Sequence, residues 1–104
     1  MRYISVDDAH KRVENGQMII LDIREPYEFE ICSINSLQIP MADVISRVSE
    51  LPRDKDIAVM CRSGKRAEAV TNMLATEHDL INSYVLEGGI LAWIQKFDTQ
   101  LESY

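Results

Sequence analysis

The sequence predicts an α/β fold with a mostly parallel sheet that is covered by helices on both faces. Short apolar runs at 18–23, 57–60 and 84–86 have the composition of strands that are buried on both sides. Each run is followed by a stretch with helical spacing, and glycine or proline often marks the boundary. Short strands that alternate with helices are typical of parallel sheets.

The elements of the first third follow from local signals. Ser5, with an aspartate three residues later, forms a capping signature for a helix over 6–15, and Gly16 is expected to end that helix. The buried strand at 18–23 comes next. A proline in the first turn then predicts a short helix over 26–29.

The remaining elements are predicted in the same way. A brief strand over 37–40 ends at proline, and the segment 42–51 has helical spacing that stops before the next proline. After the strand at 57–60, a helix is expected over 67–75. After the strand at 84–86, two glycines precede a helix over 90–97. The residues that carry the helical spacing of 42–51 are Val44, Ile45, Val48 and Leu51.

Size and composition indicate one globular domain over residues 1–104, with 46% hydrophobic residues. No apolar stretch is long enough for a signal peptide or a membrane span, so we expect a soluble, cytoplasmic protein without a membrane partner. Two cysteines are too few for a disulfide framework. His10 and His78 are far apart in sequence and not near a cysteine, so neither a metal site nor a cofactor is expected.

The formal net charge of −6 disfavours nucleic acid as a partner. The charge is uneven, however. Arg62, Lys65 and Arg66 are three cations within six residues that hold no anion, whereas the rest of the chain has eight Lys and Arg against 17 Asp and Glu. This local excess predicts an anion site. Chance clustering at a solvated helix start explains the charge pattern equally well.

Cys61 follows a buried strand and precedes a helix, at the edge of the sheet where α/β proteins bind ligands. Gly64 allows a tight turn, and a short loop that closes onto a helix N-terminus directs several N–H groups inward. The helix dipole and the nearby cations favour thiolate over thiol. A lone cysteine after an apolar strand is most often a small core residue. The combination of strand, cysteine, glycine, cations and helix favours a nucleophile instead.

The loop length separates two kinds of thiolate chemistry. Cysteine phosphatases need C-x5-R, so that the loop wraps a phosphoryl group and the arginine holds its oxygens. Here the arginine is Arg66 and position 67 is alanine, which gives C-x4-R. The shorter loop disfavours a phosphatase or arsenate reductase, and it suits a smaller anion such as the terminal sulfur of a persulfide.

Three motifs in order resemble the rhodanese-like sulfurtransferases. The segment 61–66 looks like their six-residue active-site loop, 21–29 is similar to their Asp-x-Arg-Glu signature, and 86–93 resembles their Gly-Gly-x-x-x-Trp stretch. The similarity covers nearly the whole chain. The segments 28–34 and 97–104 further resemble the C-terminal rhodanese domain of adenylyltransferase–sulfurtransferase fusions, which activate sulfur-carrier proteins.

The resemblance implies that Cys61 takes sulfane sulfur as a persulfide and passes it to an acceptor. Thiosulfate or a protein persulfide, such as that of a cysteine desulfurase, would be the donor. A thiol, cyanide or a sulfur-carrier protein would be the acceptor. Asp22 and Arg24 are expected to be framework near the site. The expected substrate-binding residues of the loop are Arg62, Ser63, Gly64, Lys65 and Arg66.

Two alternatives stay open at this stage. A rhodanese-like module can bind a partner without catalysis, although the intact cysteine and complete loop argue against that role.

The chain also departs from the family pattern at residues 32–37. Many members have Gly-His-Ile-x-Gly-Ala there, and this segment contains no histidine. Cys32 lies in this segment and could act as a resolving thiol. A small, half-buried residue is the favoured interpretation, because no spacing rule places Cys32 near Cys61.

Overall fold

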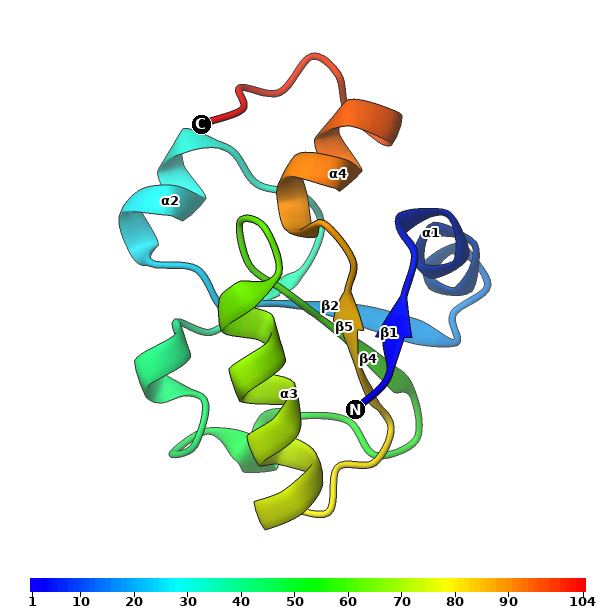
Figure 1. Cartoon of the computed structure of the whole chain (residues 1–104), viewed down its shortest axis with the longest axis vertical. Coiled ribbons are helices and arrows are strands. Elements are labelled where there is room, and N and C mark those ends of the chain that lie inside the picture. The colour runs from blue at the N-terminus through cyan, green and yellow to red at the C-terminus, as the bar shows by residue number, and fades with distance from the viewer.

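The computed structural model describes residues 1–104 and contains one five-stranded sheet in the order β1-β5-β4-β2-β3 (Figure 1). Every neighbouring pair of strands is parallel. The strands are β1 (Tyr3–Ile4), β2 (Met18–Asp22), β3 (Leu37–Gln38), β4 (Asp56–Met60) and β5 (Ser83–Leu86). The helices are α1 (Val6–Glu14), α2 (Pro26–Ile31), α3 (Lys65–Glu77) and α4 (Gly89–Phe97), with 3-10 turns η1 (Met41–Asp43) and η2 (Val48–Glu50). The predicted α/β class is confirmed.

Helices cover both faces of the sheet, as predicted. One core cluster joins β-strand residues such as Val59 to Val70 and Leu74 of α3. The other joins residues such as Met60 to Trp93 of α4 and to α1. Figure 1 shows α1 and α4 on one side of the sheet and α3 on the other. The alternation of neighbouring residues between the two faces explains why the central strands are apolar throughout.

The central strands β2 and β4 bring the ends of two motifs together. They pair in register from Met18 with Asp56 to Asp22 with Met60. The ladder continues one step further, because the N–H of Ile23 donates to the Met60 carbonyl at 3.0 Å. Residues that follow these strands therefore leave the sheet at the same edge, which places Cys61 near the chain that carries Asp22.

Most predicted elements are confirmed, with ends that shift by at most two residues. The Ser5 hydroxyl accepts a hydrogen bond from the N–H of Asp8 at 3.1 Å and caps α1 as expected. The two-residue strand β1 has no counterpart among the predicted elements, because two residues are too few for an alternation pattern. No helix of the protein combines the length and apolar character that a membrane crossing requires.

The predicted helix over 42–51 is wrong. The segment instead forms η1, a series of turns, and η2. The N–H of Arg47 has carbonyl acceptors both three and four residues earlier, and the Ser46 hydroxyl donates to the Asp43 carbonyl at 3.0 Å. Serine and β-branched residues are poor helix formers, so short 3-10 turns prevail. Ile45, expected on the apolar face, is 41% exposed.

Candidate active site

Cys61 lies directly after β4, and its sulfur is held by backbone N–H groups of the loop that follows. The Sγ atom accepts hydrogen bonds from the N–H of Gly64 at 3.1 Å and from that of Ala67 at 3.4 Å. Gly64 is the N-cap of α3 and has φ of +119°, a conformation that other residues rarely adopt. Cys61 is only 1% exposed. The strand–loop–helix arrangement therefore presents a buried sulfur to inward N–H groups at a helix start.

The Gly88-Gly89 turn and the start of α4 contact the backbone of the Cys61 loop and restrain it. The carbonyls of Cys61 and Arg62 accept hydrogen bonds from the first N–H groups of α4, those of Ile90 at 2.9 Å and Leu91 at 3.2 Å. Gly89 has φ of +61°, and a Cβ at this position would lie 2.5 Å from the Cys61 carbonyl oxygen. Because both loop carbonyls are bound by α4, the loop is held with its N–H groups free to face the sulfur. The sequence showed only that two glycines precede a helix here.

Asp22 and Arg24 form a fully buried ion pair beside the loop, and both are 0% exposed. The Arg24 guanidinium donates to both Asp22 oxygens, with the shortest bond at 2.7 Å, and also to the carbonyls of Glu28 at 3.1 Å and Cys32 at 2.8 Å. Burial by itself lowers the pKa of Arg24, but hydrogen bonds to Asp22 and Tyr104 outweigh it and raise the pKa above its usual range. These contacts connect the end of β2 to the middle and to the C-cap of α2.

Arg66 has a partner that the sequence did not reveal. Its guanidinium donates two bonds to Glu28, at 2.7 Å to Oε1 and 3.0 Å to Oε2, and Glu28 is 2% exposed. Hydrogen bonds from Arg66 are the main reason that the pKa of Glu28 falls to about 2. The same pairing raises the pKa of Arg66 above its usual range. The Arg66 charge is therefore matched by a carboxylate, and the three cations of the loop are not equivalent.

A local signal for Glu28 existed in the sequence. The N–H of Glu25, the N-cap of α2, donates to Glu28 Oε1 at 2.9 Å, which forms a capping box. The capping-box pattern identifies Glu28 as a residue that caps the start of α2. It does not predict that the carboxylate of Glu28 also binds Arg66, which lies 38 residues later in the chain. Its pairing with Arg66 depends on the tertiary fold alone.

Tyr104 is the second residue that sequence reasoning missed. Its hydroxyl accepts a hydrogen bond from Arg24 Nη1 at 2.9 Å and donates to Glu28 Oε2 at 2.6 Å. The ring also lies 5.1 Å from the Arg62 guanidinium carbon. Figure 1 shows the C-terminal segment crossing from α4 to α2. No spacing rule connects Tyr104 with the loop, so only the fold brings it to the site.

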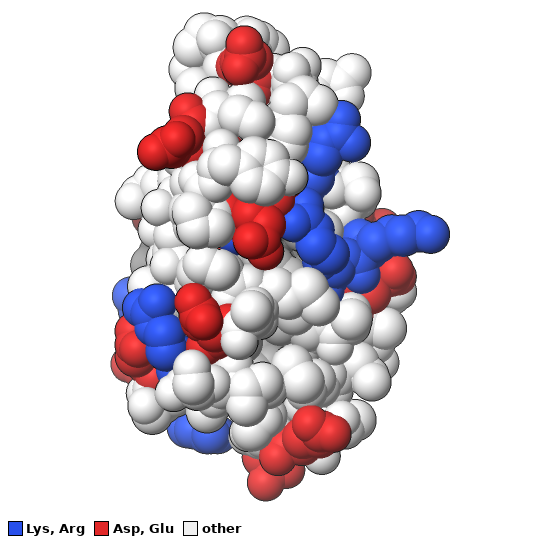
Figure 2. All heavy atoms as spheres, turned by 90° about the vertical axis from the view of Figure 1, so that its left-hand side faces the viewer, with Lys and Arg blue, Asp and Glu red and all other residues white.

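The other charged residues of the loop remain available. Arg62 and Lys65 are exposed and form no salt bridge, and Ser63 is exposed between them. On the face turned to the viewer in Figure 2, Lys and Arg atoms form a continuous run that borders Asp and Glu atoms. The local excess of positive charge that the sequence predicted therefore lies at the surface. Only two of its three cations, Arg62 and Lys65, lack an acidic partner, because Arg66 is paired with Glu28.

Cys32 lies apart from the loop cysteine. It belongs to the core cluster of α1 and α4, whereas Cys61 belongs to the cluster of α3. Both cysteines are free, and Cys32 Sγ lies 3.9 Å from Arg24 Nη1. Cys32 is 6% exposed, so it is more deeply buried than the half-buried residue that the sequence favoured, and its separation from Cys61 across the sheet agrees with a structural role. No group of three or more metal-binding side chains is present in the protein.

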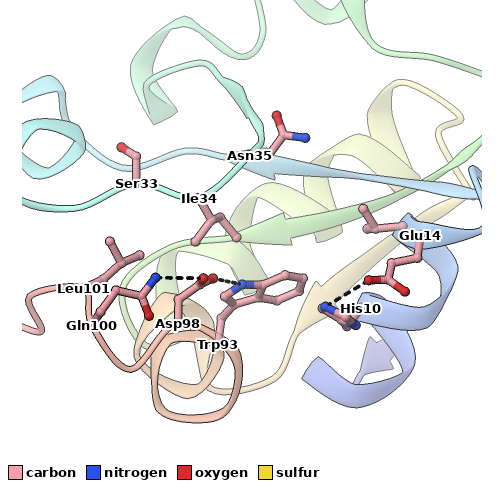
Figure 3. A pocket seen from close by; sticks show the side chains of 10 residues that line it. His10, Glu14, Ser33, Ile34, Asn35, Trp93, Asp98, Gln100 and Leu101 are labelled. Atoms are coloured by element: carbon pink, nitrogen blue, oxygen red, sulfur yellow. Dashed lines mark hydrogen bonds and ion pairs between the residues drawn. The ribbon is translucent and has the colours of Figure 1, made fainter.

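A pocket of about 430 Å³ lies away from Cys61, between α1, the 33–35 segment and the residues around α4 (Figure 3). Several of its polar side chains are bonded within the protein. Trp93 Nε1 donates to Asp98 Oδ2 at 2.9 Å, and His10 lies 3.6 Å from Glu14. None of the loop residues 61–66 lines this pocket. The pocket therefore adds nothing to the site of Cys61.

The rhodanese-like domain family matches the chain over residues 5–96, and the protein belongs to that family. The crystal structure of a rhodanese-related protein from Thermoplasma volcanium superposes with a TM-score of 0.82 at 34% identity, covering 93% of this chain and 94% of that one. The sequence resemblance to the family is thereby confirmed, and so is the fold that it implied.

Two relatives are named for sulfur transfer. A sulfurtransferase from Allochromatium vinosum is 32% identical over 87 residues, which covers 82% of this chain and 79% of that protein. The adenylyltransferase and sulfurtransferase MOCS3 of Drosophila virilis is 30% identical over 112 residues, covering 97% of this chain. This chain spans only 24% of the MOCS3 length. The similarity to the rhodanese domain of such fusions is confirmed.

Proposed function

We propose that the protein is a sulfurtransferase that carries sulfane sulfur as a persulfide on Cys61. The observation that best supports this proposal is the pair of N–H groups, from Gly64 and Ala67, that donate to Cys61 Sγ. The N–H groups of Lys65 and Arg66, in the first turn of α3, have no acceptor within the protein. A helix start with free N–H groups stabilises an adjacent anion, which a persulfide is near neutral pH.

The proposed reaction has two displacement steps. The Cys61 thiolate attacks the outer sulfur of thiosulfate, the new S–S bond forms, and sulfite leaves with the electron pair of the broken bond. Cyanide or a thiolate then attacks the outer sulfur of the persulfide. Thiocyanate or a new persulfide leaves, and the Cys61 thiolate is restored. No net oxidation is required, and a nucleophile in a loop of N–H donors suits both steps.

The pairing of Arg66 favours sulfur transfer over phosphate chemistry. A phosphatase arginine holds the phosphoryl oxygens through two parallel N–H groups of its guanidinium. Here two guanidinium nitrogens of Arg66 are already bound to the Glu28 carboxylate. Arg62 and Lys65 remain as the exposed cations that would attract a small dianionic donor. We therefore assign donor recognition to these two side chains, with Ser63 and Gly64 contributing backbone.

The similarity to MOCS3 over 97% of this chain supports a sulfur-carrier protein as an acceptor. A protein persulfide, such as that of a cysteine desulfurase, is an alternative donor, because it presents the same outer sulfur as thiosulfate. Both cysteines are free. Free catalytic thiols persist in reducing compartments, so we place the protein in the cytoplasm.

Intact mass spectrometry after thiosulfate treatment and desalting tests the proposal. The protein should gain the mass of one sulfur atom, and a reductant should remove it. Cys61→Ser should abolish the gain, whereas the matched variant Cys32→Ser should retain it. A gain that survives in Cys61→Ser would refute the site. No gain from thiosulfate or from a desulfurase persulfide would instead favour a non-catalytic partner-binding module.

A further inference from the structure

Tyr104 is anchored by two side chains that cannot readily move. Its hydroxyl is bound by Arg24 at 2.9 Å and by Glu28 at 2.6 Å. Arg24 is 0% exposed and Glu28 is 2% exposed, and each has several other partners. Burial raises the pKa of Tyr104 to about 12, so the hydroxyl keeps its proton near neutral pH and remains a donor to Glu28. The tyrosine ring is therefore held in one place by its own hydroxyl.

The ring of Tyr104 is the partner of an otherwise exposed cation. The Arg62 guanidinium carbon lies 5.1 Å from the ring centroid, within the range of a cation–π interaction. Arg62 has no salt bridge and no side-chain hydrogen bond that would restrain it otherwise. It directly follows Cys61, and its own carbonyl is held by α4. Its backbone and the end of its side chain are thus both restrained.

We propose that Tyr104 is a positioning residue that holds Arg62 beside the Cys61 loop as the cation that receives an anionic sulfur donor. The identity of that donor rests on the proposed function, whereas the effect of Tyr104 on the charge near Cys61 does not. Lys65, the other exposed cation of the loop, has no aromatic or acidic partner. The structure therefore predicts that Arg62 discriminates between anionic and neutral reagents more strongly than Lys65.

A double-mutant cycle tests the proposal during turnover of thiosulfate and cyanide. Tyr104→Leu should raise the apparent KM for thiosulfate roughly 2- to 5-fold, the range of an exposed cation–π contact, and should change kcat less. Arg62→Ala should raise KM at least as much. The double variant should match Arg62→Ala in KM, because the proposed effect of the ring on the donor runs through Arg62, whereas the contacts of Tyr104 with Arg24 and Glu28 hold the ring in place. Tyr27→Phe, at a tyrosine that is 65% exposed, is the matched control and should leave KM unchanged.

Charge-selective alkylation tests the same proposal without sulfur transfer. The rate ratio of iodoacetate to iodoacetamide at Cys61, followed by peptide mapping, reports the positive potential at the thiolate. Arg62→Ala and Tyr104→Leu should lower this ratio by similar factors, and the double variant should lower it no further. Tyr104→Phe, which keeps the ring but loses its anchor, should give an intermediate ratio.

The two experiments separate the possible failures. Additive effects of Arg62→Ala and Tyr104→Leu, in KM or in the alkylation ratio, would overturn the role of Tyr104. An unchanged ratio in Tyr104→Leu would do the same. Absence of sulfur uptake by the unmodified protein would refute the proposed function, and the alkylation ratio would still decide whether Tyr104 positions Arg62.

Discussion

Replacing Gly89 by alanine should displace the Cys61 loop, because the added methyl group would collide with the loop backbone. The residue has φ of +61°, and an added Cβ would lie 2.5 Å from the Cys61 carbonyl oxygen and in equally close contact with Arg62. These neighbours are backbone atoms, which cannot rotate away as a side chain would. The loop must shift, and the hydrogen bonds from Ile90 at 2.9 Å and Leu91 at 3.2 Å must lengthen or break.

Two effects contribute to the loss of unfolding free energy expected for Gly89→Ala. An L-residue in the left-handed region costs about 1–2 kcal/mol. Overpacking against the loop carbonyls adds about 1–3 kcal/mol. The total is about 2–5 kcal/mol, a large share of the roughly 5–15 kcal/mol that stabilises a typical domain. Gly16→Ala is the matched control, because Gly16 has φ of +74° but nothing within 4 Å of the added Cβ. Gly16→Ala should therefore lose only the backbone contribution of about 1–2 kcal/mol.

Urea unfolding of both variants measures the difference. The midpoint of Gly89→Ala should fall well below that of Gly16→Ala with a similar slope. Sulfur uptake by the folded fraction should also drop in Gly89→Ala and persist in Gly16→Ala, because only the former displaces the loop. Equal unfolding free energies for the two variants would refute the claim that contact with the loop requires glycine at this position.

Three further predictions concern Glu28, Arg24 and the class of substrate. Glu28 has a pKa of about 2 when folded against an ordinary value of 4.5, so its ionised form stabilises the fold above about pH 4.5, and that stabilisation, about 3 kcal/mol, is lost as the pH falls toward 2. Urea unfolding at pH 7, 4 and 3 should therefore show a steeper loss for the unmodified protein than for Glu28→Gln. Arg24→Lys should cost about 3–5 kcal/mol in the same assay, because lysine cannot replace the fork that binds Asp22, and a loss below 1 kcal/mol would contradict that role. Aryl phosphates should not be hydrolysed in steady-state assays, and efficient hydrolysis that depends on Cys61 would overturn the sulfurtransferase proposal.

The sequence predicted the features that depend on local order. The alternation of apolar runs with helical spacing was enough for the α/β class, and the strand–cysteine–glycine pattern located the loop at the edge of the sheet. The helix over 42–51 failed because hydrophobic spacing reports which residues are buried, and it does not report whether the backbone between them is helical. Val44 is indeed buried, although 3-10 turns and not a helix present it to the core.

The partners of the loop could not be predicted, because they come from distant parts of the chain. Glu28 lies 38 residues before Arg66, and Tyr104 lies 76 residues after Glu28. Their contacts depend on how α2 and the C-terminal segment are placed beside the loop. The local count of three cations therefore overestimated the free charge of the site, since a carboxylate from another element neutralises one of them.

Because α4 restrains the Cys61 loop, two tasks depend on different groups of the site. Main-chain atoms hold the sulfur, and exposed side chains meet the donor or acceptor. The sulfur is held by main-chain N–H groups, which every residue except proline possesses. Replacing the exposed side chains of Arg62, Ser63 or Lys65 therefore leaves the sulfur-holding groups in place. Under the proposed function, substitution at these positions changes which donor or acceptor approaches without removing the N–H groups that hold the sulfur. Related chains could thus diverge in partner choice while keeping the same sulfur receptor.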